Sequence, residues 1–253
     1  MTQTGDNNPR RTMLLTGASR GIGHATVKRF SAAGWRVISC SRQAFPENCP
    51  WEMGAQDHIQ FDLADPQNTL EAIAEIKRRL EGGRLDAPVN NAGISIVKPA
   101  LDMPEQDWDS VVNTNLRGAW LVAQGSAKRW VAAKKPGVIV NIASILGLRT
   151  IGQVAPYNAS KAGLIHLTRA LAMEWARYNI RINAICPGYI ETEMNSAFWK
   201  TPGGQKLIDR IPQRRIGKPE HLDGALLLLA SDAGEFMTGS VITVDGGHTV
   251  NSL

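Results

Sequence analysis

The 253-residue sequence has few cysteines, scattered histidines and no long apolar run. Cys40, Cys49 and Cys186 show no C-x-x-C spacing, which predicts free thiols in a reducing compartment and no disulfide framework. The five histidines do not cluster, so no metal site is predicted. The aliphatic run Leu226–Leu229 is too short to span a membrane, and residues 1–11 lack the apolar segment of a signal peptide. We therefore expect a cytoplasmic protein without membrane contacts.

The charge pattern of the chain argues against a further class, the nucleic-acid-binding proteins. The chain carries 28 Lys and Arg against 23 Asp and Glu, and these residues are interleaved along the sequence. A formal net charge of +5 in this pattern predicts a solvated surface and no nucleic-acid partner. Hydrophobic residues make up 43% of the chain, enough for one domain of this length to bury a substantial core.

Short apolar runs alternate with helical patterns after a polar start. The candidate strands are Thr12–Thr16, Arg36–Ser41, His58–Phe61, Ala87–Asn90, Val138–Ala143, Arg181–Cys186 and Val241–Val244. The candidate helices are Gly23–Ala33, Asn68–Leu80, Trp108–Lys134, Tyr157–Tyr178 and Pro219–Ala230. This alternation predicts an α/β fold, with a doubly wound parallel sheet of about seven strands flanked by helices. Residues 12–253 are expected to form that single domain, and residues 1–11 a flexible tail.

Two features disturb this pattern. Pro46, Pro50 and Gly54 leave no room for a crossover helix in residues 41–57, so this connection is predicted to be mostly loop. A proline is also awkward inside a central strand. We therefore expect Pro88 to be the first residue of the fourth strand.

A glycine-rich segment connects the first strand to a helix. Its glycines permit a tight turn and a close approach of the backbone to a pyrophosphate, whose charge a helix N-terminus favours. The glycine spacing alone is weak evidence, but strand, turn and helix in this order match the dinucleotide-binding fingerprint. The residues predicted to bind the coenzyme here are Gly17, Ser19, Arg20, Gly21, Ile22 and Gly23.

The end of the second strand predicts which coenzyme is bound. An acidic residue there would accept hydrogen bonds from the ribose hydroxyls of NAD, but this chain has Ser41 and Arg42. A guanidinium can pair with a 2′-phosphate, so NADP(H) is predicted over NAD(H), with Arg20 as a second clamp. Alternatively, both arginines are only solvent-exposed. Asp62, followed by Leu63, is predicted to bind the adenine, or else to cap a turn.

Ser144, Tyr157 and Lys161 suggest acid–base chemistry. Ser144 follows a strand, Tyr157 opens a helix, and Lys161 lies one turn later on the same helical face. A neighbouring ammonium stabilises a phenolate, which is expected to lower the pKa of Tyr157 from about 10 towards the working pH. Ser144 is expected to hydrogen-bond the substrate oxygen where charge develops.

Asn115 lies on the apolar stripe of the predicted helix Trp108–Lys134. A buried amide must be hydrogen-bonded, or it costs roughly 1–3 kcal/mol. It either organises water for a proton relay near Lys161 or is a satisfied core asparagine.

Other candidate coenzyme contacts follow the fourth and sixth strands. Small residues and amides after the fourth strand line the coenzyme groove or only make a turn. The proline and glycine after the sixth strand give a rigid wall for nicotinamide. These predicted contacts are Asn91, Ala92, Gly93, Pro187, Gly188, Ile190 and Thr192, with Tyr157 and Lys161 on the nicotinamide ribose.

Together, T-G-x-x-x-G-x-G, N-N-A-G, the helical Asn115, Ser144 with Tyr157-x-x-x-Lys161, and Pro187-Gly188 resemble the short-chain dehydrogenase/reductase family. The resemblance covers residues 12–247. It implies one Rossmann-like domain, catalysis by a Ser-Tyr-Lys-Asn set without metal, and usually a homotetramer, with a homodimer as the alternative. In such tetramers the helices matching residues 108–134 and 157–178 form one interface, and residues 241–247 support another.

The resemblance also implies a substrate site between residues 144–153, residues 188–189 and the segment before Pro219. The predicted substrate contacts are Ser144, Leu146, Gln153, Tyr157, Tyr189 and Phe198. Further apolar residues in these segments are Ile145, Ile151, Val154, Met194 and Trp199. We expect a lid near residues 189–213 with a hinge at 201–204. These apolar side chains otherwise belong to the core or to a subunit contact.

The expected reaction is hydride transfer between a nicotinamide and a ketone/secondary alcohol pair. The more specific alternative is a 3-oxoacyl-(acyl-carrier-protein) reductase, with Lys128, Arg129 and Arg169 as a docking surface. A non-catalytic nucleotide-binding or scaffold protein is the alternative of another class. The presence of both Tyr157 and Lys161 argues against it.

Overall fold

The computed structural model describes residues 10–44, 55–80, 83–193 and 195–251. Seven parallel strands form one sheet in the order β3-β2-β1-β4-β5-β6-β7. The strands are β1 (Thr12–Thr16), β2 (Arg36–Ser41), β3 (His58–Gln60), β4 (Ala87–Asn90), β5 (Gly137–Ile142), β6 (Ile180–Pro187) and β7 (Val241–Val244). The predicted doubly wound fold is confirmed, and each predicted strand is present with ends within about one residue.

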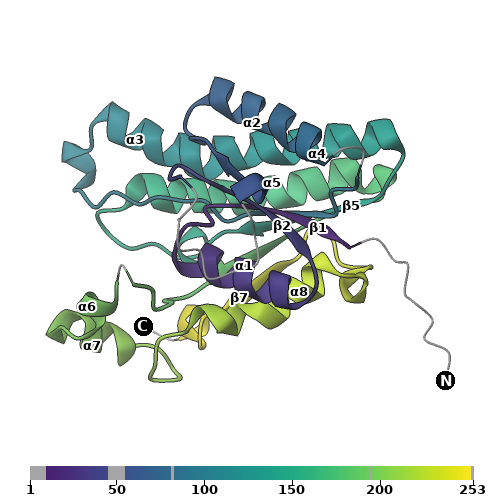
Figure 1. The fold of residues 1–253 in the computed structure, drawn as a ribbon. Helices are drawn as coiled ribbons and strands as arrows, with labels where there is room; N and C mark the ends of the chain where they lie inside the picture. Colours follow the sequence, from purple (N-terminus) through teal and green to yellow (C-terminus); the bar gives the residue numbers. More distant parts are fainter. Residues whose placement is uncertain (1–9, 45–54, 81–82, 194, 252–253) are drawn as a thin grey trace, which may run out of the picture.

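Helices cover both faces of this sheet (Figure 1). The eight α-helices of the described residues are α1 (Gly21–Ala32), α2 (Pro66–Arg79), α3 (Glu105–Val112), α4 (Gly118–Ala133), α5 (Ala155–Trp175), α6 (Ser196–Trp199), α7 (Pro202–Ile208) and α8 (Asp223–Ala230). One apolar core lies between the sheet and α2, α4 and α5, around Trp130 and Ile139. A second lies under α1 and α8, around Phe30 and Leu229.

The chain reverses its winding direction between β1 and β4. The connection after β1 runs to β2 on one side, whereas β4 lies on the other side of β1. The two loops that leave the carboxyl ends of β1 and β4 therefore diverge. Ligands of open α/β sheets bind at such a switch point, so the topology predicts where the functional site lies.

The predicted helix over residues 108–134 is present from Glu105 to Ala133, but it is not α-helical throughout. Residues Asn113–Arg117 form a π-helical turn between α3 and α4. A π-turn inserts one extra residue per turn and rotates the side chains that follow, and such turns often occur at functional sites. Asn115 lies within it.

Pro88 is the second residue of β4, not the first, so that prediction was wrong by one position. Pro88 pairs in register with Leu14 of β1, whereas the ladder with β5 begins at Val89. A proline lacks the N–H group that a ladder needs. The strand tolerates it because β5 pairs with β4 only beyond this residue.

The segment after β6 is more helical than expected. The predicted hinge at residues 201–204 is the capped start of α7, where the Thr201 hydroxyl accepts a hydrogen bond of 3.1 Å from the Gly204 N–H. Pro202 occupies the first turn, a position that a proline favours. This segment is therefore an ordered helix N-terminus.

Two other expectations fall partly outside the described residues. Pro46, Cys49, Pro50 and Gly54 of the predicted loop lie there, as do residues 1–9 of the predicted tail. Arg10, within that tail, donates hydrogen bonds to the carbonyl oxygens of Gly34 and Trp35. Arg11 pairs with Asp232. These two residues are therefore held against the domain.

Candidate active site

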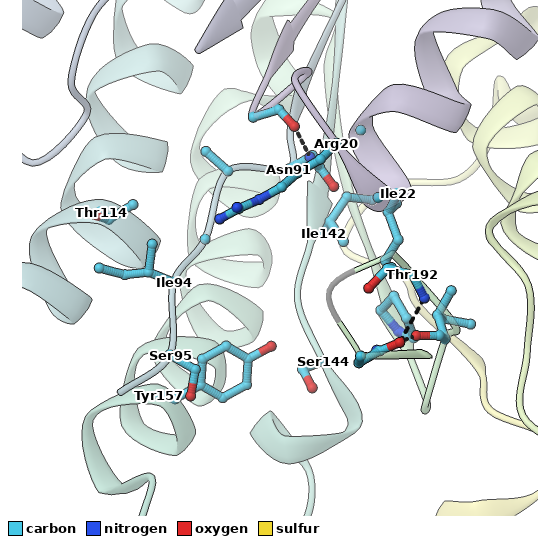
Figure 2. A pocket seen from close by; sticks show the side chains of 18 of the residues that line it. Arg20, Ile22, Asn91, Ile94, Ser95, Thr114, Ile142, Ser144, Tyr157 and Thr192 are labelled. Carbon is cyan, nitrogen blue, oxygen red and sulfur yellow. Dashed lines mark hydrogen bonds between the residues drawn. The ribbon is translucent and has the colours of Figure 1, made fainter. Parts of the chain in front are cut away.

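One continuous cavity of about 860 Å³ runs along the carboxyl ends of the central strands. Its walls come from the β1–α1 loop, the ends of β2 and β5, the segments after β3, β4 and β6, and the start of α5. Figure 2 shows Arg20 and Asn91 near one end and Tyr157 and Ser144 near the other. The cavity therefore joins the glycine-rich loop to the predicted acid–base residues.

The glycine-rich loop makes a turn that only glycine fits. A Cβ built on Gly23 would lie 2.1 Å from the Gly17 carbonyl oxygen, and Gly17 has a positive φ of 69°. The Asn91 side-chain amide donates hydrogen bonds to the carbonyl oxygens of Thr16 and Gly17 at 3.1 and 3.0 Å. Asn91 thus holds the glycine-rich loop in place, and it also lines the cavity.

The N-terminus of α1 offers unpaired N–H groups to this cavity. Among the described residues no side chain caps it, and its first turn has no acidic residue. In contrast, the Asp65 carboxylate caps α2 by accepting hydrogen bonds from the N–H groups of Gln67 and Asn68. A helix N-terminus of this kind suits an anion, so the loop fits the pyrophosphate of a dinucleotide.

The ends of β2 and β3 form the far wall of the cavity. Ser41, Arg42, Asp62 and Leu63 all border it, and no acidic residue occupies positions 40–43. The Asp62 carboxylate accepts a hydrogen bond of 2.9 Å from the Ala64 N–H, so it caps a turn and also faces the cavity. Three wall residues here were not predicted from the sequence: Cys40, Gln43 and Phe61.

Ser144, Tyr157 and Lys161 meet at the other end. The Lys161 Nζ donates a hydrogen bond of 2.7 Å to the Ile142 carbonyl oxygen and lies 5.7 Å from the centre of the Tyr157 ring. The Ser144 Oγ accepts a hydrogen bond of 3.1 Å from the Leu146 N–H, which orients the hydroxyl. Three elements, β5, the turn after it and α5, therefore bring these groups together.

Burial is the main cause of the pKa shifts of Tyr157, Lys161 and the neighbouring Cys186. It raises the pKa of the Tyr157 phenol, while a hydrogen bond with Ser144 opposes the rise. The expected net lowering of this pKa by Lys161 is not observed. Burial also lowers the pKa of Lys161 to about 8 and raises the pKa of the adjacent Cys186 thiol to about 11. Tyr157 is therefore a protonated phenol at neutral pH, and Cys186 an unreactive thiol.

Asn115 lies behind this group and does not line the cavity. It is fully buried, and its side chain exchanges two hydrogen bonds with the Ile94 backbone, at 2.8 and 2.9 Å. Its amide also donates to the Ser160 hydroxyl at 3.1 Å. A Cβ built on Gly93 would lie 3.3 Å from Lys161 Nζ and 3.4 Å from Asn115 Oδ1. Asn115 is thus a satisfied core asparagine placed beside the lysine, and its proton-relay role stays a prediction.

The coenzyme contacts predicted after β4 and β6 all border the cavity: Asn91, Ala92, Gly93, Pro187, Gly188, Ile190 and Thr192. Gly188 allows β6 to pass β7 closely, because a Cβ there would lie 2.7 Å from the Asp245 Cα. Thr192 approaches the glycine-rich loop, with its Cγ2 3.2 Å from a Cβ built on Gly21. The segment after β6 therefore closes over the start of α1.

The predicted substrate contacts are only partly brought together. Leu146, Tyr189 and Phe198 line the cavity with Ser144 and Tyr157. Gln153 does not; it is exposed, has a φ of 67°, and its carbonyl oxygen accepts a hydrogen bond from the Lys98 N–H. The other apolar candidates Ile145, Ile151, Val154 and Trp199 do line the cavity, and Met194 lies outside the described residues.

A second group of cavity wall residues was not predicted from the sequence. Ile94, Ser95 and Val97 extend from the segment after β4 into the same cavity, and Figure 2 shows Ser95 next to Tyr157. No motif marked them, because only the preceding N-N-A-G segment has a distinctive sequence. The other unpredicted wall residues are Thr114, Ile142, Ala143, Glu193 and Asn195.

Asn195 organises the segment after β6. Its Oδ1 accepts hydrogen bonds from the Thr192 N–H at 2.7 Å and the Trp199 indole at 2.9 Å. Its amide donates to the Ile190 carbonyl oxygen at 2.8 Å. Trp199 in turn packs edge-on against Tyr189 and Phe198. One side chain thus ties predicted coenzyme contacts to predicted substrate contacts.

Known proteins of one family share this architecture. A family model described as enoyl-(acyl carrier protein) reductase matches residues 17–249. The chain is 45% identical to the protein FixR of Bradyrhizobium diazoefficiens over 252 residues, covering 96% of this chain and 88% of the relative. The chain belongs to the short-chain dehydrogenase/reductase family. A 3-oxoacyl-(acyl-carrier-protein) reductase of Thermotoga maritima is 36% identical, covering 95% of this chain and 98% of the relative.

Solved short-chain dehydrogenases/reductases have the same fold. A 4-hydroxyisoleucine dehydrogenase in complex with NADH superposes with a TM-score of 0.90 at 31% identity, covering 96% of this chain and all of that one. An Agrobacterium tumefaciens protein described as a 2-deoxy-D-gluconate 3-dehydrogenase, with bound NADP, gives 0.85 at 35% identity and coverages of 95% and 97%. The protein is therefore a nicotinamide-dependent short-chain dehydrogenase/reductase acting on CH–OH groups.

Within the described ranges, no three His, Cys, Asp or Glu side chains are grouped so that they could hold a metal ion. Over the same ranges, no helix is long and apolar enough to cross a membrane.

Removing the Asn195 side chain should loosen the segment after β6. Asn195→Ala leaves the Trp199 indole and the Thr192 N–H without their acceptor, so hydrogen exchange in residues 190–199 should rise. Asn195→Asp keeps both acceptor contacts and should raise exchange less. Equal exchange in all three proteins, measured by mass spectrometry without coenzyme, would contradict the assigned role.

Proposed function

We propose that the protein is an NADP(H)-dependent oxidoreductase that interconverts a ketone and a secondary alcohol, with Tyr157 as general acid and base. The observation that carries the proposal is the cavity itself. Ser144, Tyr157 and Lys161 border one end of it, and the uncapped α1 N-terminus borders the other. An extended dinucleotide fits this arrangement, because its pyrophosphate and its nicotinamide must lie at such separated points.

The bound coenzyme supplies or accepts the hydride in this family. The chain's own groups manage the substrate oxygen. In reduction, the Tyr157 hydroxyl donates a proton to the oxygen as it gains charge, and Ser144 donates a hydrogen bond to it. Lys161, when charged, stabilises the phenolate that remains. In oxidation the same proton moves back to Tyr157.

We assign the coenzyme contacts as predicted, from the residues that border the cavity. The pyrophosphate is assigned to the glycine-rich loop, the adenine to Asp62 and Leu63, the groove between adenosine and nicotinamide to the segment after β4, and the nicotinamide to the wall that follows β6. Asn115 is assigned a positioning role, because it is buried and touches the Gly93 region rather than the cavity.

The preference for NADP(H) is supported by charge at the β2 end. Arg42 is exposed on the cavity wall, and Ser41 carries no negative charge that would repel a 2′-phosphate. Arg20, at the start of α1, is exposed on the same cavity. Since related structures hold either NADH or NADP, they are consistent with both coenzymes.

The 3-oxoacyl-(acyl-carrier-protein) reductase activity is a second candidate, and the Thermotoga maritima relative favours it. Of the proposed docking residues, Lys128 and Arg169 are exposed, whereas the Arg129 side chain donates to the Gly83 carbonyl oxygen. The surface is therefore smaller than expected. A non-catalytic scaffold protein is disfavoured, because the acid–base residues are complete and grouped.

A homotetramer is part of the proposal. Exposed apolar side chains lie on the helices expected to form one interface, with Trp120 on α4 and Met173 on α5 at 36% and 80% exposure. Phe236, before β7, is fully exposed near the second expected interface, at residues 241–247. Such side chains suit burial between subunits. A cytoplasmic location and a lid near residues 189–213 also stay predictions.

Tyr157→Phe tests the proton-transfer role. The variant should lower kcat for ketone reduction by at least about 10²-fold, because it removes the hydroxyl that is assigned to donate the proton. Binding of NADPH, measured by its fluorescence, should be nearly unchanged. Tyr178→Phe, at an exposed tyrosine beyond α5, is the matched control. Activity retained in Tyr157→Phe would reject the assignment.

Arg42→Ala tests the coenzyme preference. Loss of a charge-assisted hydrogen bond worth about 1.5–3 kcal/mol should raise the Kd for NADPH roughly 10- to 100-fold and leave that for NADH almost unchanged. Arg177→Ala, at an exposed arginine elsewhere, should affect neither. Equal losses for the two coenzymes would remove the phosphate-binding role.

The pKa of Lys161 predicts a pH dependence. Burial lowers this pKa to about 8, so the ammonium is present below pH 8 and lost above it. The kcat/KM for ketone reduction should therefore fall above about pH 8. Lys161→Arg keeps a cation at this position above pH 8. The variant should be less active than the wild type, but its kcat/KM should not fall above about pH 8. The same fall in Lys161→Arg would assign the titration to another group.

A further inference from the structure

The turn at residues 41–43, where β2 ends, borders the cavity and is held by the neighbouring strand β3. The Ser41 carbonyl oxygen accepts a hydrogen bond of 3.0 Å from the Phe61 N–H, just beyond β3. The Arg42 carbonyl oxygen accepts one of 2.9 Å from the Gln60 side-chain amide. The main chain of the turn is therefore attached to the edge strand of the sheet.

His58, the first residue of β3, makes a third contact of this kind. Its Nε2 lies 2.9 Å from the Gln43 carbonyl oxygen, and its Nδ1 lies 2.8 Å from the Ser39 hydroxyl. Because a carbonyl oxygen only accepts hydrogen bonds, Nε2 carries a proton and donates it. In the neutral ring Nδ1 then accepts from the hydroxyl of Ser39, which is buried in β2. One imidazole thus connects the buried part of β2 to the last residue of the turn.

The side chain of Ser41 stabilises the turn from within. Its hydroxyl donates a hydrogen bond of 2.9 Å to the Gln43 carbonyl oxygen, so its proton is used inside the turn. Ser41 is buried, whereas Arg42 and Gln43 are exposed and border the cavity. Arg42 is therefore the cationic side chain that this turn presents to the cavity.

The strand beneath the turn is short but firmly held. β3 has three residues and lies at the edge of the sheet. The Arg79 guanidinium, at the end of α2, donates a hydrogen bond of 2.6 Å to the His58 carbonyl oxygen, and Glu75 accepts another from it at 2.6 Å. Asp57, just before β3, pairs at 2.8 Å with Arg36 at the start of β2. These contacts fix His58 relative to both β2 and α2.

A fixed main chain improves an arginine as a ligand for phosphate. If the turn were loose, binding would have to order its backbone as well as the side chain, and the lost entropy would reduce the affinity. The contacts from β3 order the backbone beforehand, so that only the side chain of Arg42 has to be ordered. A guanidinium on such a turn can form two parallel hydrogen bonds to a phosphate.

We propose that His58 and Gln60 are positioning residues for coenzyme selection, which hold the turn at residues 41–43 so that Arg42 meets the 2′-phosphate of NADP(H). This rests on the proposed preference for NADP(H) and adds the residues that make it effective. Neither His58 nor Gln60 lines the cavity, so both act through the main chain of the turn. Replacing them should therefore weaken recognition of the 2′-phosphate and leave the rest of the coenzyme site intact.

Two adenosine ligands isolate this effect, because adenosine 2′,5′-bisphosphate differs from adenosine 5′-monophosphate only by the 2′-phosphate. Their Kd values for the full chain are measured by calorimetry, without turnover. His58→Leu removes the donor to Gln43 and should raise the Kd for the bisphosphate about 5- to 20-fold, and that for the monophosphate less than about twofold. His58→Gln retains an amide donor and should restore most of the affinity.

Gln60→Leu is a second variant that does not depend on the histidine. It removes the donor to the Arg42 carbonyl oxygen without changing the charge of the protein, so direct repulsion of the phosphate plays no part. The Kd for the bisphosphate should rise about 3- to 10-fold, and that for the monophosphate should stay nearly unchanged. Gln106→Leu, the same change at an exposed position on α3 outside the cavity, is the matched control and should affect neither.

Arg42→Ala shows whether the two residues act through Arg42. In that background His58→Leu should change the Kd for the bisphosphate by less than about twofold, because no guanidinium remains to be misplaced. If the full effect of His58→Leu persists in Arg42→Ala, the positioning role is overturned.

The outcomes separate this inference from the proposed coenzyme preference. A wild type that binds both ligands equally contradicts the preference for NADP(H), and the inference falls with it. A wild-type preference for the bisphosphate that His58→Leu and Gln60→Leu both retain overturns the inference alone. Equal losses for the two ligands also overturn it, because these residues would then support the adenosine site as a whole. Selective loss of the bisphosphate supports the inference whether or not any ketone is reduced.

Discussion

The active-site end of the molecule is built around one buried ammonium group. Lys161 is 3% exposed, and burying a charge is costly unless it is hydrogen-bonded, which the last carbonyl group of β5 provides at 2.7 Å. Two glycines leave room for Lys161. A Cβ built on Gly93 would lie 3.3 Å from the Lys161 Nζ, and a Cβ built on Gly147 would lie 2.7 Å from the Lys161 carbonyl carbon. The loops after β4 and β5 can therefore close on Lys161 only as glycine-containing turns. The position of Tyr157, one turn earlier on α5, follows from this closure.

A second set of buried polar contacts holds the strands that carry these loops. The Asn90 amide donates to Asn141 Oδ1 at 2.8 Å, and the Asn141 amide donates to the Thr168 hydroxyl at 2.9 Å. These bonds join β4, β5 and α5 directly beneath the site. Buried networks of this kind penalise any shift in register, because a shifted strand would leave amides unpaired. The apolar cores determine that the layers pack, whereas this network determines how β4 and β5 align under Lys161.

The sequence predicted the sheet and the glycine-rich turn after β1 because both depend on local signals. Alternating apolar runs marked the seven strands, and glycines marked the turn that a Cβ would block. It did not predict the π-turn at residues 113–117, since one inserted helical residue has no characteristic composition. Gln153 was misplaced because loop proximity in sequence does not fix which side chain faces the cavity. Asn195 was missed for a similar reason: its three partners become neighbours only after the segment folds back on itself.

The distribution of charge along the cavity follows from what each part must do. Phosphates need N–H groups of fixed direction, and the uncapped α1 provides them where Arg20 and Arg42 lie on the rim. The Tyr157 end of the cavity is buried, which raises the pKa of Tyr157 and lowers that of Lys161 to about 8, so at neutral pH the phenol is uncharged and the ammonium is still mostly charged. A low-dielectric centre strengthens any interaction with developing charge. Of the cations that line the cavity, Arg20 and Arg42 therefore lie exposed at the end of the glycine-rich loop, whereas Lys161 lies buried at the end of Tyr157, where water is excluded.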